Sequence, residues 1–305
     1  MKKLIILSIV LVFILFCHES HAQQNPQFTH FMFNKLVYNP AYAGNREALA
    51  ISSIYRNQWI GIDGAPRTLN VNVHTPFSGK RAGIGLSLVS DQVGMLQTTF
   101  ANIAYNYKLK INDKTQLGIG VMGRMEHGRI DWTDADPEDM ADQLIFSDVS
   151  NSWQPNVGFG FYLSGKKYYI GISAPTMLRN TLYSDIGYEG AYRTYYGMAA
   201  LILKINDKLD FKPSLLISYN QNAPLDVDFN ASFLIMDVLW LGGSIRAGDS
   251  FDAIVQYQFT NELRAGMAFD FTTSKLRDFT TGTYELMLEY TFVKGDEQLQ
   301  NIRYF

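Results

Sequence analysis

The sequence predicts an all-β fold, a transmembrane antiparallel β-barrel of about 14 strands that follows a cleaved signal peptide. Three observations support this prediction. The N-terminus has the features of a signal peptide, apolar and polar residues alternate in many later windows, and the connections between those windows alternate between short and long. We expect residues 1–22 to be the signal peptide, residues 23–47 an N-terminal periplasmic segment or plug, and residues 48–305 the outer-membrane barrel.

The N-terminus is predicted to be cleaved after Ala22. Lys2 and Lys3 precede an apolar stretch, residues 4–16, and Ser20-His21-Ala22 supplies small residues for signal peptidase. The stretch is shorter than the roughly 20 residues that a spanning helix needs. Cleavage would remove the only cysteine, Cys17, and leave a net charge of 24 − 28 = −4. We therefore expect no disulfide and no nucleic-acid partner.

Strict alternation is the strongest signal in the rest of the chain, because successive side chains of a strand point to opposite faces. In residues 263–271, for example, Leu263, Met267 and Phe269 share one face while Arg264 and Asp270 share the other. Comparable windows are 101–109, 227–233, 251–259 and 284–292. Glycine occupies the second face in two weaker windows, residues 117–121 and 157–163.

The connections give the strand number. Short turns are expected at 78–79, 112–113, 164–165, 206–207, 236–237 and 260–261, where Gly, Asn or Asp suits a hairpin. Longer loops are expected at 60–66, 91–95, 129–152, 175–190, 220–224, 247–250 and 272–282. Six short turns and seven long loops imply about fourteen strands with both ends on the short-turn side, as in bacterial outer-membrane barrels.

A soluble β-sandwich or lipocalin-like barrel is the alternative, since its strands also alternate. Two features favour the membrane barrel: the second face carries mostly Gly, Ser, Asn and isolated charges, and aromatic residues gather near the expected strand ends, where interfacial girdles lie. These aromatics are Tyr105, Tyr107, Tyr168, Tyr169, Tyr192, Tyr195, Tyr196 and Trp240. A third feature is the aromatic ending: Phe292 ends the last strand and Tyr304-Phe305 ends the chain, which resembles a barrel-assembly signal.

The sequence offers little catalytic or metal-binding chemistry. It contains no Gly-rich phosphate loop, and His30, His74 and His127 are scattered, so we predict no enzyme and no catalytic, cofactor or metal residues. The acidic stretch 131–142 could in principle hold Ca²⁺. Its spacing does not match a calcium-binding loop, however, and a solvated external loop is the favoured interpretation.

The region after the predicted cleavage site carries a long, ordered motif. It consists of Gln27-Phe28-Thr29-His30-Phe31-Met32-Phe33-Asn34, Asn39-Pro40-Ala41-Tyr42-Ala43-Gly44, Tyr55-Arg56-Asn57-Gln58-Trp59 and Pro66-Arg67-Thr68. With these residues the chain resembles the PorP/SprF family of type IX secretion system membrane proteins over essentially its whole mature length. It departs from the family's usual residues at His30, Lys35 and Val37. We single out Phe28, Asn34, Asn39, Pro40 and Gly44 as the N-terminal motif.

The resemblance implies a non-enzymatic outer-membrane barrel that supports secretion or cell-surface attachment of a large type IX substrate, for example a gliding-motility adhesin. Implied partners are the lipid bilayer, the C-terminal domain of that secreted surface protein and other type IX components. A channel for solute transport is the alternative, because fourteen strands enclose a lumen with a polar wall. The N-terminal motif is compatible either with a plug or with direct partner contact.

Partner binding is expected on the outer loops, which a barrel holds in place. The loop from Trp132 to Trp153 is the longest and most acidic, and the loop from Met177 to Tyr192 mixes apolar residues with few charges. Exposed apolar side chains in a loop indicate either a partner or an inward fold into the lumen. The candidate partner-binding residues are Trp132, Leu182, Tyr183 and Tyr188.

Overall fold

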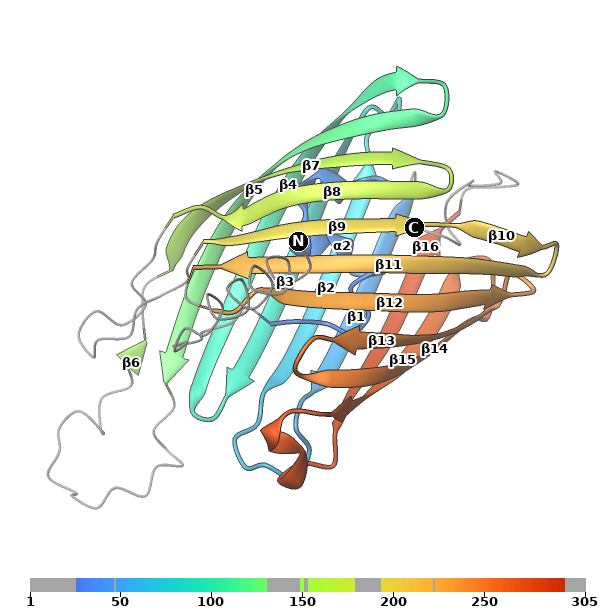
Figure 1. Ribbon diagram of the computed structural model, residues 1–305. Coiled ribbons are helices and arrows are strands. Elements are labelled where there is room, and N and C mark those ends of the chain that lie inside the picture. The colour runs from blue at the N-terminus through green and yellow to red at the C-terminus, as the bar shows by residue number, and fades with distance from the viewer. Residues whose placement is uncertain are drawn as a thin grey trace, which may run out of the picture.

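One antiparallel sheet closes on itself in the computed structural model, which describes residues 26–46, 48–130, 149–150, 153–178, 193–221 and 223–293 (Figure 1). Each strand pairs with its neighbours in the chain, and the first strand pairs with the last from Leu49↔Phe292 to Asn57↔Tyr284. This pairing closes a barrel, which removes the open edges that a flat sheet would present.

The strands are β1 (Leu49–Asn57), β2 (Arg67–Pro76), β3 (Ala82–Val93), β4 (Leu96–Asn112), β5 (Thr115–Ile130), β6 (Val149–Ser150), β7 (Gln154–Gly165), β8 (Tyr168–Thr176), β9 (Thr194–Leu201), β10 (Leu203–Asn206), β11 (Leu209–Asn220), β12 (Asp226–Ile235), β13 (Leu239–Arg246), β14 (Ser250–Gln258), β15 (Leu263–Thr272) and β16 (Thr283–Phe292). The helical elements are α2 (Lys35–Tyr38), η1 (Pro40–Tyr42) and η3 (Lys275–Asp278). No helix within the described ranges is long and apolar enough to cross a membrane.

The predicted number of strands is confirmed. In the described part of the chain the sheet has sixteen strands. Two of them do not add a position to the wall: β10 continues β9 after Ile202, and β6 is a two-residue addition beside β5. Fourteen strand positions therefore surround the lumen.

The two ends of the barrel differ as the sequence predicts. One end carries the short turns 77–81, 113–114, 166–167, 207–208, 236–238 and 259–262. In Figure 1 the turns after β7 and β10 lie at the right, and α2 lies inside the barrel. The other end carries the remaining connections, including 58–66 and the η3 region 273–282. We call these the short-turn end and the long-loop end.

Two connections at the long-loop end are shorter than predicted. The sequence predicts a loop over residues 91–95, but β3 reaches Val93 and β4 begins at Leu96. It also predicts a loop over residues 247–250, but only residues 247–249 separate β13 from β14. In the first case Asp91, within the predicted loop, pairs in register with Thr98. Backbone pairing continues beyond the apolar alternation on which the prediction rested.

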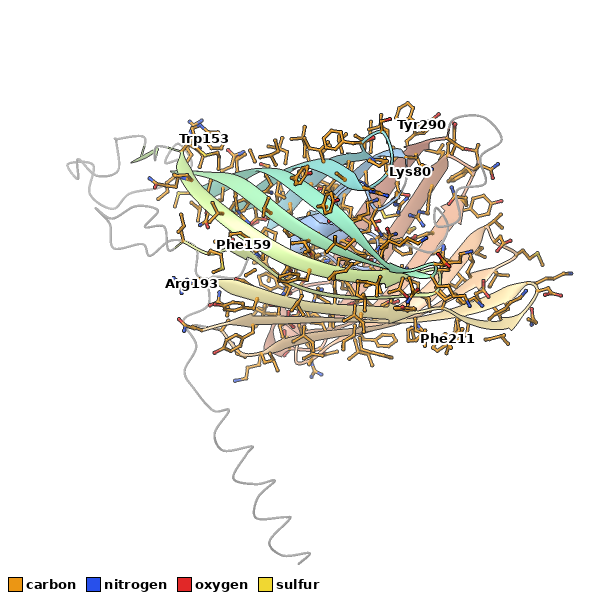
Figure 2. All side chains as sticks on the ribbon, turned by 90° about the horizontal axis from the view of Figure 1, so that it is seen from above. Lys80, Trp153, Phe159, Arg193, Phe211 and Tyr290 are labelled. Carbon is orange, nitrogen blue, oxygen red and sulfur yellow. The ribbon has the colours of Figure 1, made fainter. Side chains whose placement is uncertain are left out.

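The wall is apolar outside and polar inside. Outward side chains such as Leu86, Ile172 and Leu288 are 52%, 59% and 54% exposed, whereas inward Asp252 and Arg264 are fully buried. Phe159, Phe211 and Tyr290 project outward from the ribbon in Figure 2. This is the reverse of a water-soluble protein and matches a barrel whose outer band contacts lipid.

Three aromatics predicted for the outer girdles lie elsewhere. Tyr169, Tyr196 and Trp240 are buried and belong to the interior cluster, while Tyr105 and Tyr107 are exposed on the outer face. The strand period explains the error, because adjacent residues such as Tyr168 and Tyr169 must point to opposite faces. Aromatic composition near a strand end does not distinguish the lipid face from the lumen.

Candidate functional site

The lumen of the barrel is occupied by the chain's own residues 26–46, which we call the lumenal segment. Its side chains from Phe28 to Arg46 are buried throughout, except for the half-buried Val37. Pro26 and Gln27 are half-buried at its beginning. The interior of this barrel is thus packed like a protein core, with the segment as the central element.

Near the long-loop end the lumenal segment is fixed by buried charges. Glu285 accepts hydrogen bonds from the backbone amides of Thr29 (2.9 Å) and His30 (2.8 Å), and its carboxylate lies 2.6 Å from His30 Nδ1. Thr29 Oγ1 lies 2.9 Å from the carboxylate of Asp270. Arg56 pairs with both carboxylates, at 2.8 Å from Asp270 and 3.3 Å from Glu285. Such charge-assisted bonds between fully buried groups hold the backbone in one position.

The middle of the segment packs through aromatic rings. Phe33 meets Trp240 edge-on at 5.8 Å between ring centroids, and Tyr38 meets Tyr196 edge-on at 5.1 Å. Asn72 Nδ2 donates to Asn34 Oδ1 at 2.6 Å. The inward-facing aromatics of the wall are therefore partners of the segment, which accounts for their burial.

Cations surround these rings. Lys212 Nζ lies 4.3 Å from the centroid of Phe33, and the Arg264 guanidinium lies 4.4 Å from the same ring. Lys35 Nζ lies 4.6 Å from the ring of Tyr42. Cation–π contacts offset part of the cost of burying these ammonium groups.

The Asn39–Gly44 motif lies against glycines of the wall. A Cβ added to Gly120 would lie 2.2 Å from the amide nitrogen of Ala41, and one added to Gly160 would lie 2.2 Å from Asn39 Oδ1. Gly44 has a φ of +67°, and a Cβ there would lie 2.7 Å from Gly83 Cα. We call the wall residues that approach the segment in this way the inner glycines: Gly83, Gly85, Gly118, Gly120, Gly160 and Gly171.

The motif also forms specific hydrogen bonds. Asn39 Oδ1 accepts from the amide of Ala41 at 2.9 Å, and Asn39 Nδ2 donates to the carbonyl of Phe161 at 3.0 Å. Pro40 occupies the first position of η1, where its missing N–H costs nothing. The wall reaches the end of the motif through Lys108, whose Nζ donates to the Gly44 carbonyl at 2.6 Å. The motif is thus a tight turn that is held by hydrogen bonds within itself and to the wall.

At the short-turn end the segment is tied to the last strands by an ion-pair cluster. Arg46 and Arg264 both bind the carboxylate of Glu289, the latter at 2.7 Å. Arg46 Nε also donates to the hydroxyl of Tyr42 at 3.3 Å. All three charged groups are buried, so removal of Glu289 would leave two buried guanidinium groups without their shared carboxylate.

The structure brings the five predicted motif residues together in the lumen. Phe28, Asn34, Asn39, Pro40 and Gly44 are all buried. Of the other candidates, the structure describes Phe292 alone. Phe292 ends β16 and is 46% exposed, whereas Trp132, Leu182, Tyr183, Tyr188, Tyr304, Phe305 and the acidic stretch lie outside the described residues.

Sequence reasoning did not identify the wall residues that bind the segment, such as Glu285, Glu289 and Arg56. A signal was present for the inner glycines. Gly118 and Gly120 alternate with apolar residues on one strand, and Gly83 and Gly85 do so on another. Glycine at every second position of a strand leaves room for the close approach of another backbone. Within the described ranges, no group of His, Cys, Asp and Glu side chains is arranged to hold a metal ion.

Comparison with protein families gives a match over residues 20–290 to the type IX secretion system membrane protein PorP/SprF. The chain belongs to the PorP/SprF family. It is an outer-membrane β-barrel, and its family and fold are those of secretion and outer-membrane proteins rather than of enzymes. Comparison with curated protein sequences gives no match.

Several solved outer-membrane structures are similar to this PorP/SprF barrel. The Acinetobacter baumannii outer membrane protein Omp33 is 8% identical, with a TM-score of 0.48 over 81% of this chain and 98% of that chain. The CymD monoaromatic hydrocarbon channel is 10% identical, with a TM-score of 0.49 over 86% and 93%. A Pseudomonas aeruginosa FadL homologue is 12% identical, with a TM-score of 0.46 over 90% and 96%. Similarity at this level says nothing about function.

Proposed function

We propose that this PorP/SprF barrel is a non-enzymatic outer-membrane factor that supports secretion or cell-surface attachment of a large type IX substrate, such as a gliding-motility adhesin. Membership of the PorP/SprF family supports a role in type IX secretion. The occupied lumen is the observation that carries the proposal, because a barrel whose interior is packed from Phe28 to Arg46 offers little room for a solute path.

The packing favours a plug that stays in place. Glu285 accepts hydrogen bonds from two backbone amides near the start of the segment. Arg46, at the end of the segment, is paired with Glu289. Expelling the segment would expose Phe28, Phe31 and Met32 to water together with these buried charges. Burial of each such apolar side chain stabilises by roughly 1.5–3 kcal/mol. Solute transport through this lumen would require that whole set of interactions to break.

With the lumen filled and the outer wall facing lipid, the surfaces left for a cargo are the two ends. We assign cargo contact to the long-loop end, because a substrate that has crossed the membrane meets that side. The described part of this end already presents apolar side chains: Trp153 is 48% exposed beside His127, and Leu178 is 45% exposed. The predicted contact residues Trp132, Leu182, Tyr183 and Tyr188 belong to the same two loops.

The proposal is tested by replacing Leu182, Tyr183 and Tyr188 together with serine. We expect a barrel that still assembles and remains heat-modifiable on gels, while the type IX substrate is released into the medium. A matched control is serine at Phe77 and Lys80, in a turn at the opposite end, which should leave the substrate attached.

Planar-bilayer conductance distinguishes a secretion or attachment factor from a solute channel. A plugged barrel should show little conductance in the wild type and in the triple variant. Retained cargo combined with a new solute-permeable pore would contradict the proposal, because the loop would then be part of a gate. A large open conductance of the wild-type barrel would favour transport.

A further inference from the structure

We infer that the lumenal segment runs through the entire barrel with its N-terminal end at the cell surface, so that Pro26 and Gln27 belong to the extracellular surface of the protein. This orientation does not depend on the proposed cargo role. It follows from where successive residues of the segment contact the wall, and from which end of the barrel faces outward.

The first contacts of the segment lie near the long-loop end of the barrel. Gln27 Nε2 donates to Asp226, the first residue of β12 after the 221–225 connection of the long-loop end. Thr29 and His30 bind Asp270 and Glu285, two residues from the long-loop ends of β15 and β16 respectively. The segment thus begins at the long-loop end.

Later residues of the segment contact the other half of the wall. Asn39 reaches the carbonyl of Phe161, four residues before the short-turn end of β7. The Gly44 carbonyl accepts from Lys108, four residues before the short-turn end of β4. Arg46 binds Glu289, three residues before the end of β16. Between these two ends the path turns back once, because Phe33 packs on Trp240 near the short-turn end whereas Tyr38 packs on Tyr196 near the long-loop end.

The length of the segment agrees with a full crossing. A ten-residue strand such as β16 spans about 33 Å at 3.3 Å per residue. The twenty residues from Gln27 to Arg46 could reach about 66 Å if fully extended. α2, η1 and the reversal between Phe33 and Tyr38 shorten this path, which still leads from one end of the lumen to the other.

The orientation in the membrane follows from the connections. Bacterial outer-membrane barrels place short turns in the periplasm and longer loops outside. In Figure 2, Trp153 and Arg193 of the long-loop end lie far from Lys80, which belongs to a short turn. Gln27 therefore lies at the outer mouth, where it lines a small polar recess with Thr194, Asn220 and Asp226.

This arrangement places the N-terminal end of the segment beside a connection of the long-loop end. The recess offers amide, hydroxyl and carboxylate groups, and it is bordered by Ala223 and Pro224 of the 221–225 connection. Cleavage at the predicted site after Ala22 would leave three residues ahead of Pro26. A protein partner that binds the outer loops would then meet the N-terminus of the barrel as well.

Cysteine labelling of intact cells tests the orientation, because Cys17 is the only cysteine in the sequence and the unaltered chain serves as background. Pro26→Cys should react with a membrane-impermeant maleimide on intact cells, as should Asp278→Cys in the exposed η3 helix. Asp113→Cys, in a short turn where the side chain is 93% exposed, should react only after the outer membrane is permeabilised. Met32→Cys, fully buried, should react in neither condition.

Labelling of Pro26→Cys only after permeabilisation would overturn the inference. If Pro26→Cys is not labelled in either condition, cross-linking with a short bifunctional maleimide tests the orientation of the segment. It should link Gln27→Cys to Asp226→Cys within one chain and should not link Gln27→Cys to Lys108→Cys. Linkage to the Lys108 position, or to neither position, would contradict the orientation.

Discussion

Asn39 fills the space that a side chain at Gly160 would need, because its side-chain oxygen lies 2.2 Å from the position of a Cβ built on residue 160. The wall strand β7 and the lumenal segment therefore fit together only because position 160 lacks a side chain. Position 120 on β5 has the same relationship to the backbone of Ala41. The inner glycines are the complement of the Asn39–Gly44 motif.

Alanine at either inner glycine should loosen the segment. We expect Gly120→Ala or Gly160→Ala to lower the free energy of unfolding by about 1–3 kcal/mol, as overpacking does, and to raise lumenal conductance. Urea unfolding followed by gel mobility measures the first effect, and planar-bilayer recording measures the second. The control is Gly123→Ala on the same β5 strand, where a Cβ meets only Ile103 Cγ2 at 3.5 Å. Equal effects at positions 120 and 123 would contradict the predicted fit.

A side chain at position 44 would meet two obstacles, a left-handed backbone and a close neighbour, whereas one at position 248 would meet only the first. Gly44→Ala places a side chain at φ +67° and within 2.7 Å of Gly83 Cα, whereas Gly248→Ala has φ +79° with nothing nearby. Left-handed backbone alone costs about 1–2 kcal/mol. We expect Gly248→Ala to show that cost and Gly44→Ala to exceed it clearly in urea titrations. A smaller loss at position 44 would argue against the tight turn.

Glu285 should be the most sensitive buried charge at the outer half of the lumen. Glu285→Ala removes one of the two carboxylates that pair with Arg56 and leaves two backbone amides without their acceptor, and breaking a buried pair costs about 3–5 kcal/mol. The variant should unfold at lower urea, and limited proteolysis should cut near Thr29. The exposed pair Lys204–Asp207 supplies the control, since Asp207→Asn should cause no measurable change. Wild-type protease resistance in Glu285→Ala would refute this assignment.

Because the outer face of the wall contacts lipid, we expect the cost of a lysine substitution there to depend on its depth in the bilayer. Leu288→Lys and Phe269→Lys should each cost about 2–4 kcal/mol if the position lies at the bilayer midplane. Phe259→Lys, in a short turn at the membrane edge, should cost at most about 1 kcal/mol. Folding into lipid vesicles at graded urea concentrations measures all three. Equal costs at the three positions would mean that the outer face does not contact lipid.

The alternation of residues was sufficient to predict the wall of the barrel. Leu288 faces outward and Met287 inward, as the period of two requires. The inward positions Ala268 and Met287 belong to the interior cluster, so we expect polar substitutions there to cause a loss of packing. Period two identifies the inner face but gives no information about what fills it.

The contacts of the lumenal segment were beyond prediction for a different reason. Thr29 meets Asp270, 241 residues away, and this contact exists only once the barrel has closed. Local patterns carry information about strands and turns, whereas the filling of the lumen depends on which of many inward charges come to lie opposite the segment. Neither the Arg46–Glu289 pair nor the Glu285 site has a local signature.

The contacts of Arg46 have a consequence for the closure of the barrel. Arg46 precedes β1 by a few residues, and Glu289 belongs to β16, which pairs with β1 at the seam of the cylinder. The seam is thus joined twice, by the strand ladder in the wall and by ionic contacts from within. Glu285 and Glu289 of β16 both bind the lumenal segment, so the strand that closes the cylinder is also the strand that binds what fills it. Loss of the segment would therefore weaken the seam of the wall as well as empty the lumen.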